Sequence, residues 1–427
     1  METIILFLLF VGFFLLNVPI AISLAVAALI ILATTTDFTL FMMAQRMFAS
    51  LLSPPLLAIP SFVFAGVVMS HGGISKYLIA SLRAWFGHLP GGISVVTIVA
   101  CSIFAAISGS SPATAAAIGA IMYPALVEGG YPKRYAMGLI AAAGTLGILI
   151  PPSVTMVIFG ITAEVSIGDL FMGGLLPGIF LAGMLVVMAI VVAIKNNYGR
   201  DKKATWAERR KTSVKAIPGV LLPFFILGSI YTGVCTPTEA AVLSVFYTLI
   251  VSIFIYKELK FSNVRKILVE SVSIASMIYL IIAAAMVFSL YLTAKQVPQS
   301  VASWIAENTL NKYVFFALAN LMFFVMGTFL EAVSITLITL PLLLPIIYAL
   351  NIDIVQFCVV MTVNMELAMI TPPVGLNLFV VSAMADEKLE EVVKGVWPFI
   401  LLLIAALIIF VIWPDISTYI PRVLMHN

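Results

Sequence analysis

Long apolar stretches alternate with short polar segments along the whole 427-residue chain. Many of these stretches contain the roughly 20 residues that a helix needs to cross the hydrocarbon core of a bilayer. Because no water reaches the backbone there, each stretch must satisfy its own hydrogen bonds, and the pattern predicts α-helices. Residues 1–33 lack the basic start and the small-residue cleavage site of a signal peptide, so they predict a retained first transmembrane helix.

Two of the apolar stretches contain a proline pair where a spanning helix should be continuous. They read GTLGILIPPSVTM from Gly144 to Met156 and MELAMITPPVGLN from Met365 to Asn377. Proline has no N–H to donate, and its ring clashes with the preceding helical turn. The sequence therefore predicts two helices that are broken inside the apolar region.

Each broken helix follows two short apolar arms that are joined by a polar tip. The first arms, residues 91–107 and 114–130, flank the segment SGSSPAT, and the second pair lies within residues 314–350. A polar turn at membrane depth is tolerated only where it is buried in protein or lines a wet cavity, so both segments predict re-entrant hairpins. The second tip contains the polar or small residues Gly327, Thr328, Glu331 and Ser334.

Composition agrees with a polytopic membrane protein. Hydrophobic residues make up 63% of the chain and charged residues only 10%, against about 25% charged in soluble domains. The charges are unevenly placed: residues 195–215 contain eight of the 22 Lys and Arg residues, and residues 257–266 contain four more. By the positive-inside rule both segments are expected to be cytoplasmic. We expect the lipid bilayer, and no nucleic acid, as the chain's surroundings.

The two halves of the chain repeat each other. Both contain, in the same order, a span, an amphipathic segment, two apolar arms, a proline-broken helix and a final span. Counting crossings from the basic loop places the two hairpin mouths on opposite sides of the membrane, so the repeats are expected to be inverted. A shift of 221 positions aligns Pro124 with Pro345, Pro151 and Pro152 with Pro372 and Pro373, Gly174 with Gly395, and Pro177 with Pro398.

Broken helices in inverted repeats are typical of secondary transporters, where free carbonyls coordinate Na⁺ and half-helix N-termini face anionic substrates. The chain contains no Walker A segment and no HExxH motif, and no His or Lys base lies within reach of a nucleophilic Ser108 or Ser111. We therefore expect a transporter and not an enzyme. A channel is the other alternative, and it would show neither saturation nor dependence on a binding protein.

The segment SGSSPATAAAIGAIMYPALVEGGYPKRYAMGLIAAAGTLGILIPPSV, followed by SIGDLFMGGLLPGI, resembles the signature of the large membrane subunit of tripartite ATP-independent periplasmic (TRAP) transporters. The resemblance covers essentially the whole chain. It implies an inverted-repeat, elevator-type fold in the bacterial inner membrane that imports organic acids with a Na⁺ gradient and needs no organic cofactor. It also implies two partners, a small membrane subunit of about four helices and a periplasmic substrate-binding protein. Because the chain begins at its first helix, we expect the small subunit to be a separate polypeptide.

Carried onto this sequence, the resemblance implies two Na⁺ sites, each between a hairpin tip and a break. Hydroxyl and carbonyl oxygens suit a hard cation, and glycine lets the backbone approach closely. Substrate is expected between the two cation sites, lined by Ser110, Ser111, Pro112, Thr155 and Asn377. The first cation site comprises Ser108, Gly109, Ser110, Ser111, Gly144, Thr145, Gly147 and Pro152. The second comprises Gly327, Thr328, Glu331, Met365, Glu366, Met369, Thr371 and Pro372.

Two acids lie deep in apolar sequence, and their roles stay open at this point. Glu331 can cap the second arm of its hairpin, contribute to the cation site or couple protons, and Glu366 is an intramembrane functional candidate. Arg46 is expected to anchor an interfacial arm helix. General likeness to sialate-type subunits makes sialic acid the first expected substrate and a C4-dicarboxylate the second.

The expected elevator divides the chain into a moving unit and a scaffold. Amphipathic segments near residues 38–48 and 262–271 are expected to be arms that join the two. The expected divisions are residues 1–90 (scaffold helices and an arm), 91–165 (first transport repeat), 166–312 (scaffold with the basic loop and a second arm), 313–385 (second transport repeat) and 386–427 (C-terminal scaffold helix).

Overall fold

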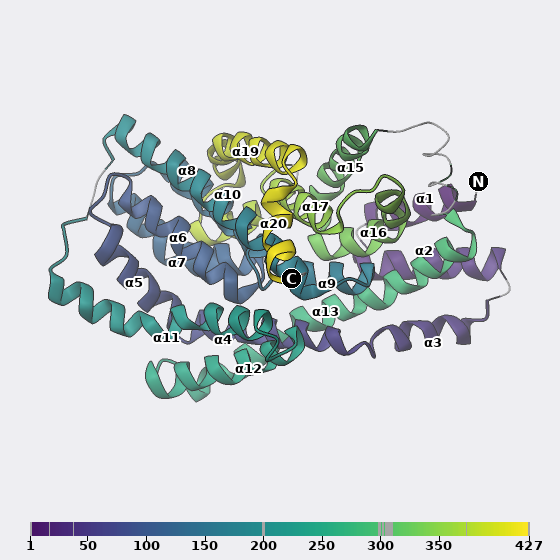
Figure 1. Ribbon diagram of the computed structural model, residues 1–427, viewed down its shortest axis with the longest axis horizontal. Helices are drawn as coiled ribbons and strands as arrows, with labels where there is room; N and C mark the ends of the chain where they lie inside the picture. The colour runs from purple at the N-terminus through teal and green to yellow at the C-terminus, as the bar shows by residue number, and fades with distance from the viewer. Residues whose placement is uncertain are drawn as a thin grey trace.

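A computed structural model describes residues 2–16, 18–36, 38–198, 201–297, 300, 303, 311–372 and 374–425 (Figure 1). All regular structure in this described part is helical, as the sequence predicts. Eight of its helical stretches are long and apolar enough to cross a membrane. The prediction of an all-α chain with several membrane-spanning helices is therefore confirmed.

The first half of the chain forms α1 to α10, with a short 3₁₀ helix, η1, ahead of α4. The first interrupted helix is α8 and α9, and the 30-residue α10 follows it. The bounds are α1 Glu2–Leu15, α2 Ile20–Thr35, α3 Leu40–Ser50, η1 Pro54–Leu57, α4 Ala58–His71, α5 Ile74–Phe86, α6 Gly92–Ser108, α7 Ser111–Glu128, α8 Lys133–Leu149, α9 Val154–Ala163 and α10 Ile167–Asn196.

The second half begins with α11 and α12, contains the second hairpin and broken helix, and ends with α19 and α20. A π-helical turn, η2, extends α12, and α17 with α18 forms the second interrupted helix. The bounds are α11 Trp206–Tyr231, α12 Pro237–Ile250, η2 Val251–Ile255, α13 Phe261–Ala294, α15 Lys312–Gly327, α16 Ala332–Ala349, α17 Ile354–Met369, α18 Leu376–Ala385, α19 Leu389–Ile412 and α20 Asp415–Met425.

One expectation about helix boundaries is wrong. Residues 1–33 do not form one helix, because α1 ends at Leu15 and α2 begins only after Pro19, which has no N–H and stands at the N-cap. Of the two segments expected to be arms, residues 262–271 lie at the start of the continuous 34-residue helix α13. Residues 38–48 overlap a separate helix, α3, with Thr39 capping its N-terminus.

Both predicted breaks and both pairs of arms are present as helices. The first break separates Leu149 from Val154, and the second separates Met369 from Leu376. Pro373, the second proline of that pair, lies outside the described residues. The arms α6 and α7 form one hairpin and α15 and α16 the other, and Figure 1 shows the two hairpins on opposite sides of the centre.

The two repeats interlock through their hairpins. The arm α7 of the first hairpin packs against α18 of the second broken helix, and α16 of the second hairpin packs against α9 of the first. Aromatic contacts extend this core, with the rings of Phe159 and Phe357 6.4 Å apart. The order of elements therefore places each hairpin next to both breaks.

The helix α19 lies directly on α8. A Cβ at Gly138 would come within 2.1 Å of the carbonyl oxygen of Gly395, so glycine is needed for this close approach of two backbones. An ion pair 2.5 Å long joins Lys133, the first residue of α8, to Glu387 in the connection ahead of α19. This packing places α19 directly against the first broken helix.

Candidate functional site

The tip of the first hairpin rests on the first break. Gly109 adopts a left-handed conformation, with φ +59°, between α6 and α7. A Cβ at Gly109 would lie 3.0 Å from the carbonyl oxygen of Pro152, and one at Gly147 would lie 2.5 Å from the carbonyl oxygen of Ser110. A Cβ at Gly144 would likewise meet the Cβ of Ala115 at 2.6 Å. These glycines let the tip and the break approach through their backbones, as the sequence predicts.

The first break frees carbonyl groups because of its two prolines. In a continuous helix the N–H groups of residues 151 and 152 would bond to the carbonyls of Gly147 and Ile148, but proline has none. The hydroxyl of Ser153 donates to the Ile148 carbonyl at 2.6 Å and so replaces one of the two missing backbone hydrogen bonds. The Gly147 carbonyl has no such replacement within the described residues, so it is available to a ligand.

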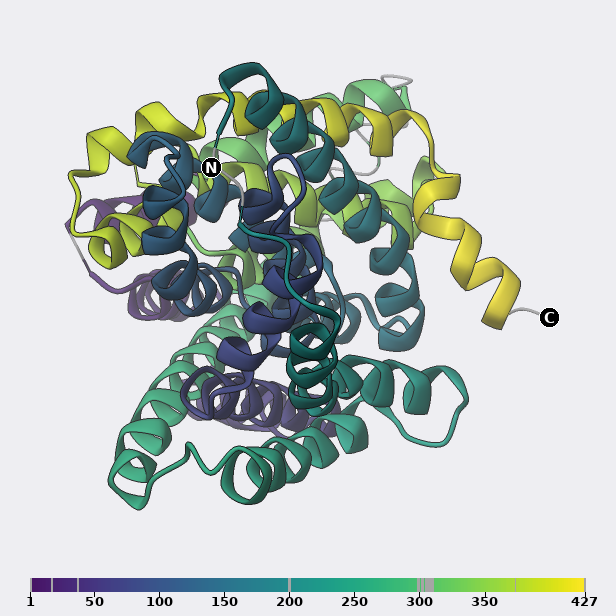
Figure 2. The same ribbon diagram turned by 90° about the vertical axis from the view of Figure 1, so that its left-hand side faces the viewer.

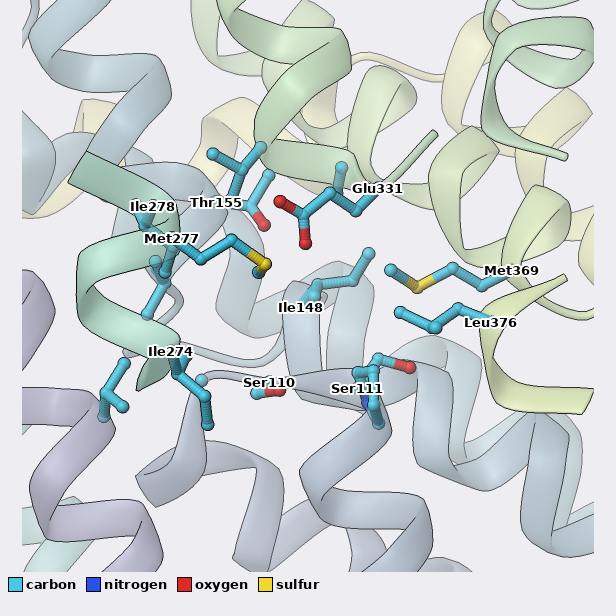
Figure 3. A pocket seen from close by; sticks show the side chains of 16 residues that line it. Ser110, Ser111, Ile148, Thr155, Ile274, Met277, Ile278, Glu331, Met369 and Leu376 are labelled. Carbon is cyan, nitrogen blue, oxygen red and sulfur yellow. The ribbon is translucent and has the colours of Figure 1, made fainter. Parts of the chain in front are cut away.

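Hydroxyl groups at the first tip differ in their availability. The oxygens of Ser108 and Thr114 are 2.8 Å apart, and Thr114 also donates to the Ser110 carbonyl at 2.8 Å. The hydroxyl of Thr145 donates to the carbonyl of Ala142 at 2.7 Å within its own helix. By contrast, the Ser110 hydroxyl has no hydrogen bond in the described part of the chain, and Figure 3 shows this side chain at the cavity.

The second tip rests on the second break in a similar way. A Cβ at Gly327 would lie 2.4 Å from the Cβ of Ala368, and the N–H of Gly375 donates to the Thr328 carbonyl at 3.3 Å. The hydroxyl of Thr328 donates to its own helix, to the carbonyl of Val325, at 2.8 Å. The hydroxyl of Thr371 donates to the Leu367 carbonyl at 2.7 Å. This tip and this break are therefore in direct contact.

Two carboxyl groups near the second tip and break have buried oxygens without hydrogen-bond partners among the described residues. Glu331 stands at the N-cap of α16, but its side chain accepts no hydrogen bond from that helix, and its Oε1 is buried and unpartnered. Of the roles left open for Glu331, capping of α16 is therefore not seen in the structure. Glu366, on α17, is fully buried, and neither of its oxygens has a partner.

A cavity of about 90 Å³ lies where both tips and both breaks meet (Figure 3). Four helices begin at its wall, because Ser111, Val154, Ala332 and Leu376 are the first residues of α7, α9, α16 and α18 and all four line it. Glu331 is the one ionisable side chain in this lining, and Figure 3 shows it pointing toward Thr155. The arrangement offers unpaired helical N–H groups on several sides of one small space.

The structure brings seven of the 19 predicted site residues together at this cavity. Gly109, Ser110, Ser111, Pro112, Thr155, Glu331 and Met369 line it. Gly327 and Thr328, again with Glu331, line a neighbouring cavity of about 360 Å³. Ser108, Gly144, Thr145, Gly147, Pro152, Met365, Glu366, Thr371, Pro372 and Asn377 do not line the central cavity.

Asn377 is a buried link between the repeats. Its amide nitrogen donates to the Ser111 hydroxyl at 2.8 Å and to the carbonyl of Ala141 at 3.1 Å, while its Oδ1 has no partner within the described residues. The residue therefore ties the second break to the first hairpin instead of facing the cavity.

The cavity wall also includes apolar side chains that the sequence did not single out. They come from α13 as Ile274, Met277 and Ile278 and from α4 as Val63. Nothing in their pattern separates them from lipid-facing residues, since both environments select apolar side chains.

This arrangement defines a class of protein: a multi-pass helical membrane protein in which hairpins and broken helices enclose a central cavity. The comparisons with known proteins agree. Residues 7–416 match the family described as "Tripartite ATP-independent periplasmic transporter, DctM component", and the chain belongs to this family. It is thus a component of a transporter and not an enzyme, and its relatives are named as permeases.

Two relatives and one solved structure illustrate the likeness. The chain is 37% identical to the C4-dicarboxylate TRAP transporter large permease protein DctM of Rhodobacter capsulatus, over 99% of this chain and 100% of the relative. It is 32% identical to the sialic acid TRAP transporter permease protein SiaT of Haemophilus influenzae (strain 86-028NP), over 96% of this chain and 66% of the relative. The crystal structure of the YdaH transporter of Alcanivorax borkumensis shares the fold, with a TM-score of 0.60 at 15% identity, over 96% and 98% of the two chains.

Proposed function

We propose that this chain imports an organic-acid anion across the bacterial inner membrane together with Na⁺. The observation that carries the proposal is the meeting of four helix N-termini and two polar hairpin tips at one cavity. Each N-terminus presents unpaired N–H groups and the positive end of a helix dipole, which stabilise an anion. The cavity lining contains no lysine or arginine, so these helix ends are the positive groups that it offers to a carboxylate.

The first Na⁺ site in this proposal lies between the first tip and the first break. The free carbonyl of Gly147 and the unpartnered hydroxyl of Ser110 support it, because both are hard oxygen ligands and the two residues approach within van der Waals contact. The Thr145 hydroxyl donates one hydrogen bond and keeps both lone pairs. The Ser108 hydroxyl already contacts Thr114 Oγ1 at 2.8 Å and accepts from the Ser110 N–H at 3.4 Å, so it has less capacity left for a cation.

The second Na⁺ site lies between the second tip and the second break. Support comes from the contact of Gly327 and Thr328 with the break and from the unpartnered carboxylate oxygen of Glu331. A buried carboxylate oxygen without a partner is costly, and a bound cation would offset that cost. We therefore assign Glu331 to the cation site in preference to a capping role.

Movement in this proposal is of the elevator type, with both hairpins re-entrant and the repeats inverted. Side chains of α13 and α4 form one apolar wall of the cavity, while hairpin tips and breaks form the rest. An apolar wall without hydrogen bonds to the tips is suited to sliding, because no specific bond has to be broken.

The proposed partners are a separate small membrane subunit and a periplasmic binding protein that delivers the substrate. Sialic acid remains the substrate expected from the sequence. The 37% identity to a permease named for C4-dicarboxylates, over the full length of both chains, makes a C4-dicarboxylate the first substrate to test. Neighbouring genes for sialate catabolism, or for a dicarboxylate sensor pair, would separate the two.

Reconstitution in liposomes tests the proposal. With the small subunit in the membrane and the binding protein outside, uptake of the radiolabelled acid is expected to saturate and to require external Na⁺. Omission of the binding protein, or replacement of Na⁺ by K⁺, is expected to abolish it. Uptake by this chain alone, or uptake that is indifferent to the cation, would contradict the proposal.

A further inference from the structure

Another cavity, which shares no lining residue with the central cavity, lies where the coil ahead of α11 crosses the end of α5. Its volume is about 510 Å³, within the range typical of small-molecule sites. Four basic side chains line it, together with the acids Asp201 and Glu208. Figure 2 looks onto this end of the molecule, where the coil runs across the hairpin helices into α11. The basic residues of the lining are Lys76, Arg83, Lys202 and Lys203.

Two of the four cations are already paired, and two are not. Arg83 binds Asp201 through two nitrogens, at 2.9 Å and 2.8 Å, and this hydrogen-bonded pair raises the pKa of the guanidinium. Lys76 donates to Glu258 at 2.9 Å. Lys202 and Lys203 are exposed and have no ion-pair partner in the part of the chain that the structure describes. The cavity therefore has a surplus of positive charge that a bound anion would compensate.

The Arg83–Asp201 pair also holds the coil in place. The N–H of Asp201 donates to the carbonyl of Gly87 at 3.0 Å, so both the backbone and the side chain of this residue are bound to the end of α5. The two free lysines follow directly in sequence, so the anchored Asp201 keeps their backbone close to the cavity. A loop that is held at one end loses less conformational freedom on binding than a fully mobile loop does.

Aromatic side chains indicate the depth of this cavity relative to the bilayer. The rings of Trp85 and Trp206 meet edge to face, with centroids 5.6 Å apart, and Trp206 is 70% exposed. The guanidinium of Arg209 lies 5.1 Å from the Trp85 ring and donates to the carbonyl of Ala84. Exposed tryptophan beside arginine and lysine is typical of the head-group layer of a membrane.

Apolar surface adjoins the basic cavity. Phe86 and Leu89, just after the cavity residue Arg83, are 38% and 39% exposed. Ile121 of α7, an arm of the first hairpin, also lines the cavity. A ligand with a phosphate at one end and hydrocarbon chains at the other matches this combination, whereas a small soluble anion would use only the lysines.

We infer that this cavity binds the phosphate head group of an anionic phospholipid of the cytoplasmic leaflet, through Lys202 and Lys203. The inference is independent of the transported substrate and of Na⁺ coupling. Its lipid touches α5 and α11 on one side and Ile121 of the first hairpin on the other, so it bridges the scaffold loop and a transport helix.

Titration of the purified full-length protein with three probes tests the inference. The probes are phosphatidylglycerol, phosphatidylethanolamine and inorganic phosphate, and the readouts are tryptophan fluorescence and the number of lipids retained in native mass spectrometry. Wild-type protein is expected to bind phosphatidylglycerol at least about tenfold more tightly than the other two, with an affinity that falls as salt rises. Equal affinity for phosphatidylethanolamine, or inorganic phosphate binding as tightly as the anionic lipid, would overturn the assignment.

A matched pair of double variants distinguishes lipid binding in this cavity from a general effect of surface charge. Lys202→Ala with Lys203→Ala removes two charges from the lining, and Arg210→Ala with Lys211→Ala removes two charges from the same segment outside it. At about fivefold per lysine, the first pair is expected to weaken phosphatidylglycerol binding about 25-fold, and the second to leave it nearly unchanged. An equal loss in both pairs would refute the site. If the first pair does not yield folded protein, the lipid selectivity and salt dependence of the wild type still decide the question.

Discussion

Replacing Gly147 with alanine is expected to displace the first hairpin tip from the first break and to weaken Na⁺ binding. The added Cβ would lie 2.5 Å from the carbonyl oxygen of Ser110, and that atom belongs to backbone and not to a flexible side chain. An unstrained carbon–oxygen contact is about 3.3 Å, so the tip must move by about 0.8 Å. The change therefore tests whether the contact between tip and break matters for the cation.

The size of the effect follows from the cost of overpacking, about 1–3 kcal/mol. If the tip moves and the whole of this cost weakens Na⁺ binding, the Na⁺ concentration for half-maximal uptake should rise about 5- to 150-fold, at 1.4 kcal/mol per factor of ten. The assay is uptake into proteoliposomes against external Na⁺, at matched protein abundance. Gly183→Ala on α10 is the control, because its Cβ would meet nothing within 4 Å while helix propensity improves equally.

Two results would refute this reasoning. A Gly147→Ala protein whose Na⁺ curve superimposes on that of the wild type would show that the close contact is unimportant for coupling. An equal rise in the Gly183→Ala control would show that the effect arises from helix propensity and not from the contact.

Three further predictions concern side chains around the same contacts. Ser110→Ala and Thr328→Ala should each raise the Na⁺ concentration for half-maximal uptake at unchanged abundance, and unshifted curves in both would leave only main-chain coordination. Glu331→Gln should weaken Na⁺ dependence at constant thermal stability, since the carboxylate caps no helix; a loss of stability with normal Na⁺ dependence would indicate a structural role. Asn377→Ala should lower the free energy of unfolding by about 1–3 kcal/mol, because it removes the two hydrogen bonds that Asn377 donates to the first repeat. An unchanged melting temperature would contradict this.

The sequence predicts the breaks well because their cause is local. Pro151 and Pro152 remove backbone donors wherever the chain folds, and Gly109 marks a turn that needs a positive φ. The early break at Pro19 has the same local cause, but the strong hydrophobicity of residues 1–33 masked it.

Other features depend on tertiary packing and could not be predicted. Met277 of α13 lines the cavity, yet its helix has the composition of a lipid-facing span. The side chain of Asn377 points to Ser111, 266 residues away, and spacing along the chain carries no information about such a partner. The close packing of Gly138 on Gly395 is equally non-local, and it places α19 against the first broken helix.

That packing gives a direct test of which helices move together. A cross-link between cysteines placed on the facing surfaces of α8 and α19 should leave transport intact if both belong to the moving unit. A cross-link between α16 and α13, which meet at the cavity wall, should stop transport. Full activity with the second cross-link would exclude sliding at this wall.

The coupling of a carboxylate to Na⁺ at the central cavity is the main claim, and one measurement tests it most directly. Proteoliposomes holding this chain and its small subunit, with binding protein outside, are loaded so that the labelled acid is equal on both sides, and an inward Na⁺ gradient is then imposed. The account predicts net accumulation of the acid inside, and loss of that accumulation when the gradient is made of K⁺. An acid that stays at equilibrium under the Na⁺ gradient, or that accumulates equally with K⁺, would contradict it.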